Sequence, residues 1–201
     1  MNRRLGVLIS GRGSNLQSLL DAIGTGRLDA TIAVVISNIE NAAGLDRARA
    51  AGLEAVVLSH RGWASRDDYD RALARELKAR DVGLVCLAGF MRIVGGPLID
   101  AYPNAILNIH PALLPSFPGV DAQRQALAHG VKVSGVTVHF VTRALDDGPI
   151  VLQRAVAVLD DDTRETLSLR ILEQEHLAYP EAVGVVLDGR WTVEGRRFVR
   201  L

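Results

Sequence analysis

The sequence predicts an α/β fold of the Rossmann-like type, with a mostly parallel twisted sheet and helices on both faces. Three observations predict it. Short apolar segments alternate with segments of helical periodicity, glycine-containing turns separate many of them, and the segment 82–88 contains hardly a polar residue. Strands that are continuously apolar are buried on both faces, as in parallel sheets covered by helices. A chain of 201 residues fits one domain, 1–201, which we divide at about 1–102 and 103–201.

The first half of the chain alternates strands and helices regularly. After the first strand, leucines and an isoleucine recur at helical spacing, and Ser14 with Gln17 forms a capping-box pattern that places the helix start at a glycine turn. The same order then repeats. We expect strands at 5–9, 31–36, 53–58 and 82–88, and helices beginning near Ser14, at 41–51 and near Ser65 and Asp68.

The second half is less regular. A strand at 105–109 is followed by a loop with three prolines, which predicts irregular backbone. We expect a helix at 122–129, strands at 133–139 and 150–159, a long helix from about Thr163, and short extended pieces from 189 to 199.

Composition narrows the class of partner. Basic and acidic residues balance at 23 each, which removes the positive surface expected of a nucleic-acid or anionic-membrane binder and favours small molecules. No apolar run suits a signal peptide or a membrane span, and Cys86 is the only cysteine, so we expect a cytoplasmic protein with a buried thiol. The histidines form no metal-ligand pair, and no G-x-S-x-G elbow of a hydrolase occurs, so we expect no metal.

The segment Ser10-Gly11-Arg12-Gly13-Ser14-Asn15 lies between a strand and a helix start, where backbone N–H groups and the helix dipole favour a phosphate. Leu16 stands where the dinucleotide fingerprint needs its third glycine, and the lysine of the Walker pattern is missing. A monophosphate fits best, although a tight turn without a ligand explains the motif equally well.

Asn108 and His110 are two residues apart at the end of an apolar strand, so their side chains point the same way. In open α/β sheets, ligands bind outside the carboxyl ends of the strands. An amide donor beside an imidazole suits stabilisation of an oxyanion, against the alternative of a hydrogen-bonded structural histidine. His139 ends another strand, and a turn with Asp146 follows it. Glu175 falls on the inward face of the last helix, where its charge needs an arginine or a ligand.

Four segments carry a resemblance that runs almost end to end. They are Leu8 to Gln17, Leu87 to Ile93, Leu107 to Pro115, and Val138 to Thr142 with Asp146. Together they resemble the phosphoribosylglycinamide formyltransferases of the folate-dependent formyltransferase family. The Asn-x-His-Pro…Leu-Leu-Pro block is shared by the wider family, whereas the Ser-Gly-x-Gly-Ser-Asn start and Gln174-Glu175-His176 are typical of the purine-pathway branch.

The resemblance implies a reaction in de novo purine biosynthesis. The amine of N1-(5-phospho-D-ribosyl)glycinamide, or glycinamide ribonucleotide, attacks the formyl carbon of 10-formyltetrahydrofolate, and tetrahydrofolate leaves. Asn108 and His110 would stabilise the oxyanion, while Asp146 would keep His110 charged and help to move the proton. The first half would bind the phosphate, and the second would carry the catalytic and folate-binding groups. The partners would be these small molecules, in a monomer or a homodimer.

The same resemblance implies two sets of binding residues. Those for the phosphoribosyl amine are Gly13, Ser14, Asn15, Leu172, Glu173, Gln174 and Glu175. Those for the folate are Arg66, Met91, Arg92, Ile93, Val94, Asn108, Thr142, Arg143, Ala144 and Leu145, with the two arginines expected at the glutamate tail.

Four positions depart from the family pattern. Ala112 replaces a serine, Ser116 a lysine, Val94 a leucine and Asp147 a small residue. We expect Ala112 to change the hydrogen bonding of the catalytic loop, and Asp147 to repel Asp146 and so to alter the pH profile.

Two other functions stay open. Formyltetrahydrofolate deformylases share the three catalytic residues but carry an extra N-terminal domain, and a non-catalytic phosphoribosyl-binding protein would use the glycine turn alone. Methionyl-tRNA formyltransferases have a longer chain with a further C-terminal domain, so we do not expect this function here.

Overall fold

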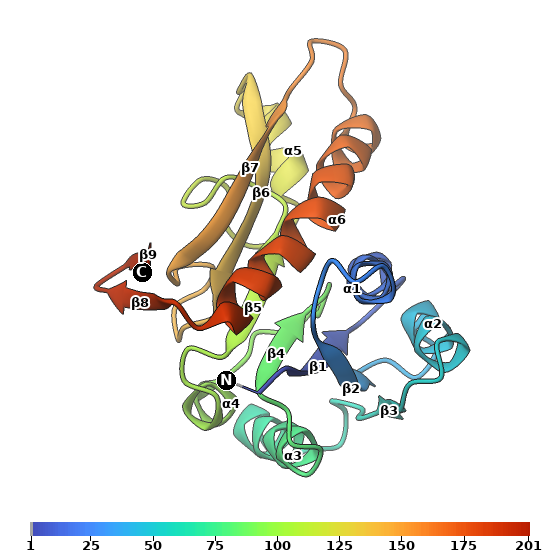
Figure 1. The fold of residues 1–201 in the computed structure, drawn as a ribbon. Helices are drawn as coiled ribbons and strands as arrows, with labels where there is room; N and C mark the ends of the chain where they lie inside the picture. Colours follow the sequence, from blue (N-terminus) through green and yellow to red (C-terminus); the bar gives the residue numbers. More distant parts are fainter. Residues whose placement is uncertain (1) are drawn as a thin grey trace. The chain divides into compact units, whose positions relative to one another are not determined.

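The computed structural model describes residues 2–201. They divide into two compact units, one that ends at Leu107 and one that spans Asn108–Leu201. The strand β5 (Ile106–His110) runs from the first unit into the second. Both units are α/β, as the sequence predicts (Figure 1).

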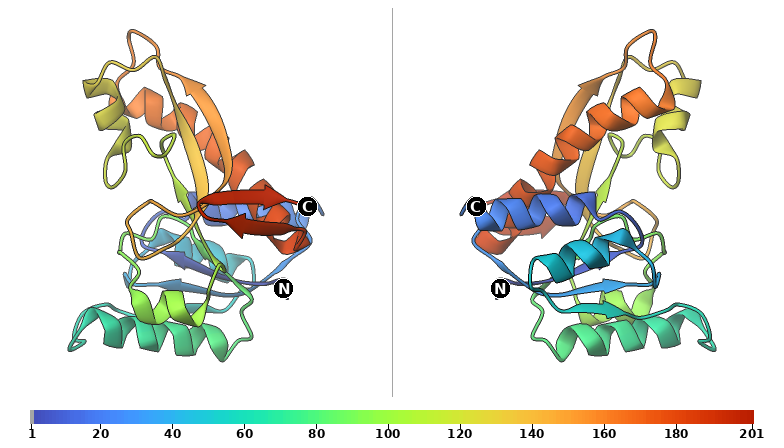
Figure 2. Two further views of the ribbon diagram at one scale, coloured as in Figure 1. Left: turned by 90° about the vertical axis from the view of Figure 1, so that its left-hand side faces the viewer. Right: turned by 90° about the vertical axis from the view of Figure 1, so that its right-hand side faces the viewer.

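The first unit contains four parallel strands in the order β3-β2-β1-β4. Leu8 of β1 pairs with Ile36 on one side and Leu87 on the other, so the carboxyl ends of three strands are aligned. Helices α1 and α2 cover one face, and α3 and α4 cover the other (Figure 2). The strands are therefore apolar along their length because both faces are covered. Their bounds are β1 Arg4–Ile9, β2 Thr31–Ser37, β3 Ala55–Val57 and β4 Leu84–Leu87, and the helices are α1 Ser14–Gly24, α2 Ala43–Ala50, α3 Arg66–Lys78 and α4 Gly96–Ala101.

The start of α1 differs from the expected capping box. The N-cap is Gly13, with φ 71°, and no side chain caps the helix, because Ser14 is already its first helical residue. The Gln17 side chain instead donates to Asp21 and accepts a hydrogen bond from Arg47. The glycine turn does begin the helix, but the capping-box prediction was wrong because a left-handed glycine takes the cap position.

Glycine at position 13 also permits a close approach of two backbones. A Cβ atom there would lie 2.6 Å from the Cα of Gly44 in α2. The Gly44 N–H donates to the Gly11 carbonyl, and Arg47 donates to the Arg12 carbonyl. The turn after β1 is thus fixed from α2 by contacts that a side chain at position 13 would obstruct.

Two elements of the first unit differ from expectation in extent. β3 covers three residues rather than 53–58, and the short helix α4, which has a proline in its first turn, lay outside the prediction. A helix of six residues is too short to show a helical period in the sequence. Ser65 caps α3 by accepting from the Asp68 N–H, as predicted.

The second unit is built on an antiparallel pair, β6 with β7, continued by β9 and β8. The long helix α6 lies along β6 and β7 (Figure 1). Thr163 caps it in a capping box with Thr166. Neither α6 nor any other helix of residues 2–201 is long and apolar enough to cross a membrane. The bounds are α5 Ala122–Ala128, β6 Val133–Phe140, β7 Ile150–Ala157, α6 Arg164–Asp188, β8 Trp191–Glu194 and β9 Arg197–Arg200.

The close approach at Gly13 predicts a difference between two glycine substitutions. Gly26 has the same left-handed backbone, with φ 72°, but a Cβ there meets nothing within 4 Å. Gly26→Ala should lower the free energy of unfolding by about 1 kcal/mol through backbone strain alone. Gly13→Ala should cost roughly a further 1–3 kcal/mol because it adds a backbone collision. Urea unfolding measures both, and equal losses would contradict the packing argument.

Candidate active site

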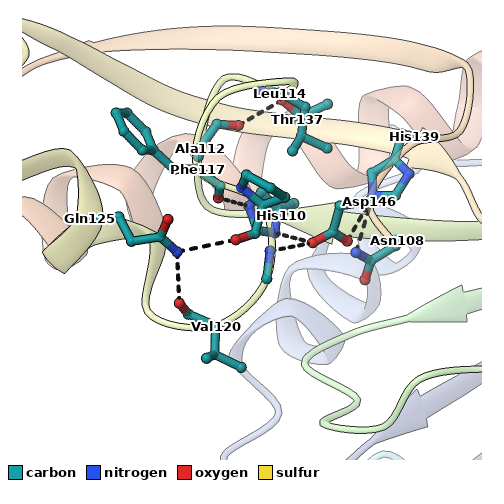
Figure 3. Close-up of polar contacts among 12 residues, drawn as sticks. Asn108, His110, Ala112, Leu114, Phe117, Val120, Gln125, Thr137, His139 and Asp146 are labelled. Atoms are coloured by element: carbon teal, nitrogen blue, oxygen red, sulfur yellow. Dashed lines mark hydrogen bonds and ion pairs between the residues drawn. The ribbon is translucent and has the colours of Figure 1, made fainter. Parts of the chain in front are cut away.

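Asn108 and His110 project from the carboxyl end of β5, on the same side of the strand (Figure 3). His110 is buried and Asn108 is half-buried. This placement is the one that the two-residue spacing predicts.

Both ring nitrogens of His110 face oxygen acceptors. Nδ1 lies 3.5 Å from Oδ2 of Asp146, and Nε2 lies 2.8 Å from the Phe117 carbonyl (Figure 3). A carbonyl oxygen only accepts, so Nε2 carries a proton in this geometry. A proton on Nδ1 as well would make the ring a cation beside a carboxylate, which is the form suited to stabilising an oxyanion.

Asp146 reaches this position through a special backbone. It lies in the loop between β6 and β7 with φ 49°, a left-handed conformation that aspartate tolerates better than most residues. Its side chain is 9% exposed, and its Oδ2 accepts from the Gly119 N–H at 2.8 Å. A Cβ atom on Gly148 would lie 1.8 Å from the Phe140 carbonyl, so the loop can return to β7 only with glycine there. The Asp146 carboxylate therefore meets His110, as the resemblance implied.

His139 also lies at this site, beside Asn108, and the sequence did not predict its contacts. Its Nδ1 donates to the Phe140 carbonyl at 2.9 Å. In the neutral ring Nε2 is then an acceptor, and it takes a hydrogen bond from Nδ2 of Asn108 at 3.2 Å. Burial lowers the pKa of His139, which keeps the ring neutral. The second N–H of the Asn108 amide meets no acceptor among residues 2–201, so it remains available to a ligand.

The turn after His110 is held by side chains from the strands beside it. Thr137 Oγ1 donates to the Ala112 carbonyl and accepts from the Leu114 N–H, while Gln153 donates to Thr137 and to the Leu114 carbonyl. Ala112 is fully buried, so its methyl group packs at the position where the resemblance leads us to expect a serine. The backbone of this turn is hydrogen-bonded without a hydroxyl at position 112.

Asp147 does not act as the sequence suggested. Its carboxylate pairs with Arg196 at 2.6 Å, and this hydrogen bond lowers the pKa of Asp147. The expectation that Asp147 acts mainly by repelling Asp146 was wrong. The charge of Asp147 is neutralised by Arg196, which lies 49 residues away in sequence.

The candidates in the first unit lie at the start of α1, on the loop after β4 and at the start of α3. Gly13, Ser14 and Asn15 form the start of α1, where no acidic residue occupies the first turn. On the loop after β4, Met91 and Ile93 are 77% and 52% exposed, whereas Val94 is buried. The remaining two candidates are arginines: Arg66 is the exposed first residue of α3, and the Arg92 guanidinium lies over the Tyr69 ring at 5.2 Å.

The other candidates in the second unit lie on α6 and on the loop after β6. Glu175 is buried on α6, as its inward face predicts, and it makes contacts within the chain. Leu172 and Gln174 are half-buried, and Glu173 is exposed. Thr142 is half-buried, whereas Arg143, Ala144 and Leu145 are exposed. Among residues 2–201, no three acidic, histidine or cysteine side chains gather to hold a metal ion.

The chain is similar to known formyltransferases in both sequence and structure. A family model described as formyl transferase matches residues 3–183. The phosphoribosylglycinamide formyltransferase of Escherichia coli K12 is 44% identical over 184 residues, which cover 92% of this chain and 87% of that protein. The crystal structure of glycinamide ribonucleotide transformylase 1 from Symbiobacterium toebii is 56% identical, with a TM-score of 0.98, over 100% of this chain and 94% of that one.

Some curated relatives are much longer than this chain. The trifunctional purine biosynthetic protein adenosine-3 of Drosophila melanogaster is 47% identical over 189 residues, which cover 93% of this chain but 14% of that protein. The chain thus spans about one seventh of such relatives.

The lowered pKa of His139 predicts how stability varies with pH. Unfolded His139 takes up a proton below its ordinary pKa of 6.5, whereas the buried folded ring stays neutral to lower pH. The free energy of unfolding should therefore fall below pH 6.5, by at most about 1.4 kcal/mol per pH unit from this residue. His139→Gln keeps an acceptor for Asn108 but cannot titrate.

Urea unfolding between pH 5 and pH 7.5 tests this. The stability of the wild-type protein relative to His139→Gln should decline as the pH drops below 6.5. His129→Gln, at an exposed histidine, provides the reference for losing one histidine. Parallel pH curves for the wild type and His139→Gln would refute the buried neutral ring.

Proposed function

The chain belongs to the formyltransferase family, and we propose that it transfers the formyl group of 10-formyltetrahydrofolate to the amine of N1-(5-phospho-D-ribosyl)glycinamide. The reaction belongs to de novo purine biosynthesis. The observation that carries the proposal is the contact of His110 with Asp146 beside the outward N–H of Asn108. This arrangement supplies two hydrogen-bond donors and a carboxylate, which are the groups that acyl transfer to an amine requires.

The proposed reaction proceeds by addition and elimination. The amine nitrogen forms a bond to the formyl carbon, whose carbonyl oxygen becomes an oxyanion. The Asn108 amide and the protonated His110 ring donate to that oxygen. The amine loses a proton, N10 of the folate gains one, and cleavage of the carbon–N10 bond leaves the formylated amine and tetrahydrofolate. Asp146 balances the charge of His110 and takes part in moving the proton.

The Phe117 carbonyl defines where the formyl oxygen would bind. It accepts from Nε2 of His110, while Nδ1 faces Asp146. To donate to the substrate, His110 has to give up one of these acceptors. The neutral carbonyl is the weaker acceptor, so we infer that the formyl oxygen replaces Phe117 and that the Asp146 contact is kept.

Two features support the phosphoribosyl amine as acceptor. The N-terminus of α1 has no side-chain cap, which suits a phosphate held by Gly13, Ser14 and Asn15. The buried carboxylate of Glu175 would bind the ribose or amine end, together with Leu172, Glu173 and Gln174.

The folate would meet apolar side chains and backbone on two loops. Met91 and Ile93 are exposed apolar side chains on one loop, and Leu145 is exposed on the other. We propose that Met91 to Val94, Asn108 and Thr142 to Leu145 bind the pteridine end, and that Arg66 and Arg92 bind the glutamate tail. We further propose that the enzyme acts in the cytoplasm as a monomer or a homodimer, without a metal and without a nucleic-acid partner.

Formation of tetrahydrofolate from 10-formyltetrahydrofolate tests the function. We expect turnover only when phosphoribosylglycinamide is present, with one formylated amine formed per tetrahydrofolate. Comparable turnover with water alone would instead identify a deformylase. Binding of the phosphoribosyl amine without any turnover would identify a non-catalytic binding protein.

Asp146→Asn tests the proposed role of the carboxylate. Asparagine retains an oxygen for the Gly119 N–H but carries no charge to pair with His110. We expect kcat to fall on the order of 10²- to 10⁴-fold, with both KM values nearly unchanged. The matched control is Asp147→Asn, which removes the neighbouring carboxylate that pairs with Arg196, and it should leave kcat within about twofold. Equal effects of the two variants would remove Asp146 from the mechanism.

A further inference from the structure

The segment Gly89–Gly95 connects β4 to α4 without helix or strand structure, and we name it the 89–95 loop. Phe90 and Val94 are buried, whereas Met91 and Ile93, which lie between them in the chain, are exposed. A loop that displays apolar side chains without regular backbone pairing needs other interactions to hold its shape.

Ser10 holds the loop near its start. The Ser10 N–H donates to the Gly89 carbonyl at 3.1 Å, and Ser10 Oγ accepts from the Met91 N–H at 2.8 Å. The hydroxyl proton is directed to Oδ1 of Asn38 at 2.5 Å, which leaves an oxygen lone pair for Met91. Asn38 is itself buried and bonded to His60, so the Ser10 hydroxyl is fixed in one orientation.

Asp70 holds the loop at its other end. This residue of α3 is 2% exposed, and its Oδ2 accepts from the Gly95 N–H at 2.6 Å. A Cβ atom on Gly95 would lie 2.6 Å from that same oxygen, so the carboxylate occupies the space that glycine leaves free. Burial disfavours the charged carboxylate and raises the pKa of Asp70, while the hydrogen bond from the Gly95 N–H acts in the opposite direction.

Arg92 adds a contact between the two ends, because its guanidinium lies over the ring of Tyr69, the residue before Asp70. The backbone N–H groups of Arg92 and Ile93 donate to no group among residues 2–201. The loop is therefore fixed at its ends while the amides at its centre remain available.

We propose that Ser10 and Asp70 are positioning residues, which hold the 89–95 loop in the shape that binds the folate. This inference rests on the proposed function, because it takes that loop as part of the folate site. Neither side chain contacts the ligand in this scheme. Each removes freedom from the unliganded loop, so that binding does not have to order it.

The test compares Asp70→Ala, Asp70→Asn, Ser10→Ala and the Ser10→Ala/Asp70→Ala double variant. Asp70→Ala should raise the folate KM about tenfold, the effect of one lost hydrogen bond to a charged acceptor, and leave kcat and the KM of the amine within about twofold. Asp70→Asn should restore most of the affinity, since its amide oxygen still accepts from Gly95. The double variant should lose less affinity than the product of the single losses, because both act on one loop.

Asp162→Ala is the matched control for stability. The Asp162 side chain is 2% exposed, and besides its ion pair with Arg170 it accepts from a backbone N–H, that of Leu159, in the second unit. We expect it to lower the melting temperature without changing the folate KM. Amide hydrogen exchange should become faster in the 89–95 loop of the Asp70→Ala and Ser10→Ala variants but not in the control.

Calorimetric titration with tetrahydrofolate separates this proposal from the proposed function. If the wild-type protein binds no tetrahydrofolate, the function itself is wrong. If the wild type binds it and Asp70→Ala binds it equally well, only the positioning role is overturned. A loss confined to kcat, or a folate KM raised as much by Asp162→Ala, would overturn it as well.

Discussion

The hydrogen bond between Asn108 and Nε2 of His139 sets the orientation of the polar groups at the candidate active site. Nδ1 of His139 is committed to the Phe140 carbonyl, so the buried neutral ring can offer only an acceptor at Nε2. The Asn108 amide must then point its nitrogen toward His139, and the second N–H of that nitrogen is directed away from the ring. A protonated His139 would present two donors and reverse this amide, which is why burial of the neutral ring matters to the whole site.

Backbone conformation, rather than residue type alone, brings Asp146 to His110. The loop from β6 to β7 needs a left-handed residue at Asp146 and a glycine at Gly148, where the chain passes against the Phe140 carbonyl. Such conformations persist only when surrounding contacts hold them. The Gly119 N–H and the ring of His110 provide those contacts through the carboxylate, so the group proposed for catalysis also fixes its own loop.

The sequence predicted what depends on local periodicity and little that depends on distant partners. Alternation placed Asn108 and His110 on one side of β5, and the glycine turn located the start of α1, although the left-handed Gly13 displaced the predicted cap. The six-residue α4 is too short to show a period. The partners of His139 and Asp147 come from other strands and loops, and nothing in the spacing of single residues encodes such pairs. Asp146 was found through family resemblance because its role needs a loop conformation that the sequence alone does not specify.

The hydrogen bond between His110 and the Phe117 carbonyl affects how strongly His110 stabilises the bound substrate compared with the transition state of the proposed reaction. It holds His110 with an acceptor of the same chemical kind as a formyl oxygen, so replacement of one by the other conserves the number of hydrogen bonds. Binding of the substrate carbonyl therefore gains little from His110 in the ground state. As the amine adds, the formyl oxygen becomes an anion, while the Phe117 carbonyl would have stayed neutral. The advantage of the exchange thus grows with the charge on the oxygen, and the interaction stabilises the transition state more than the bound substrate.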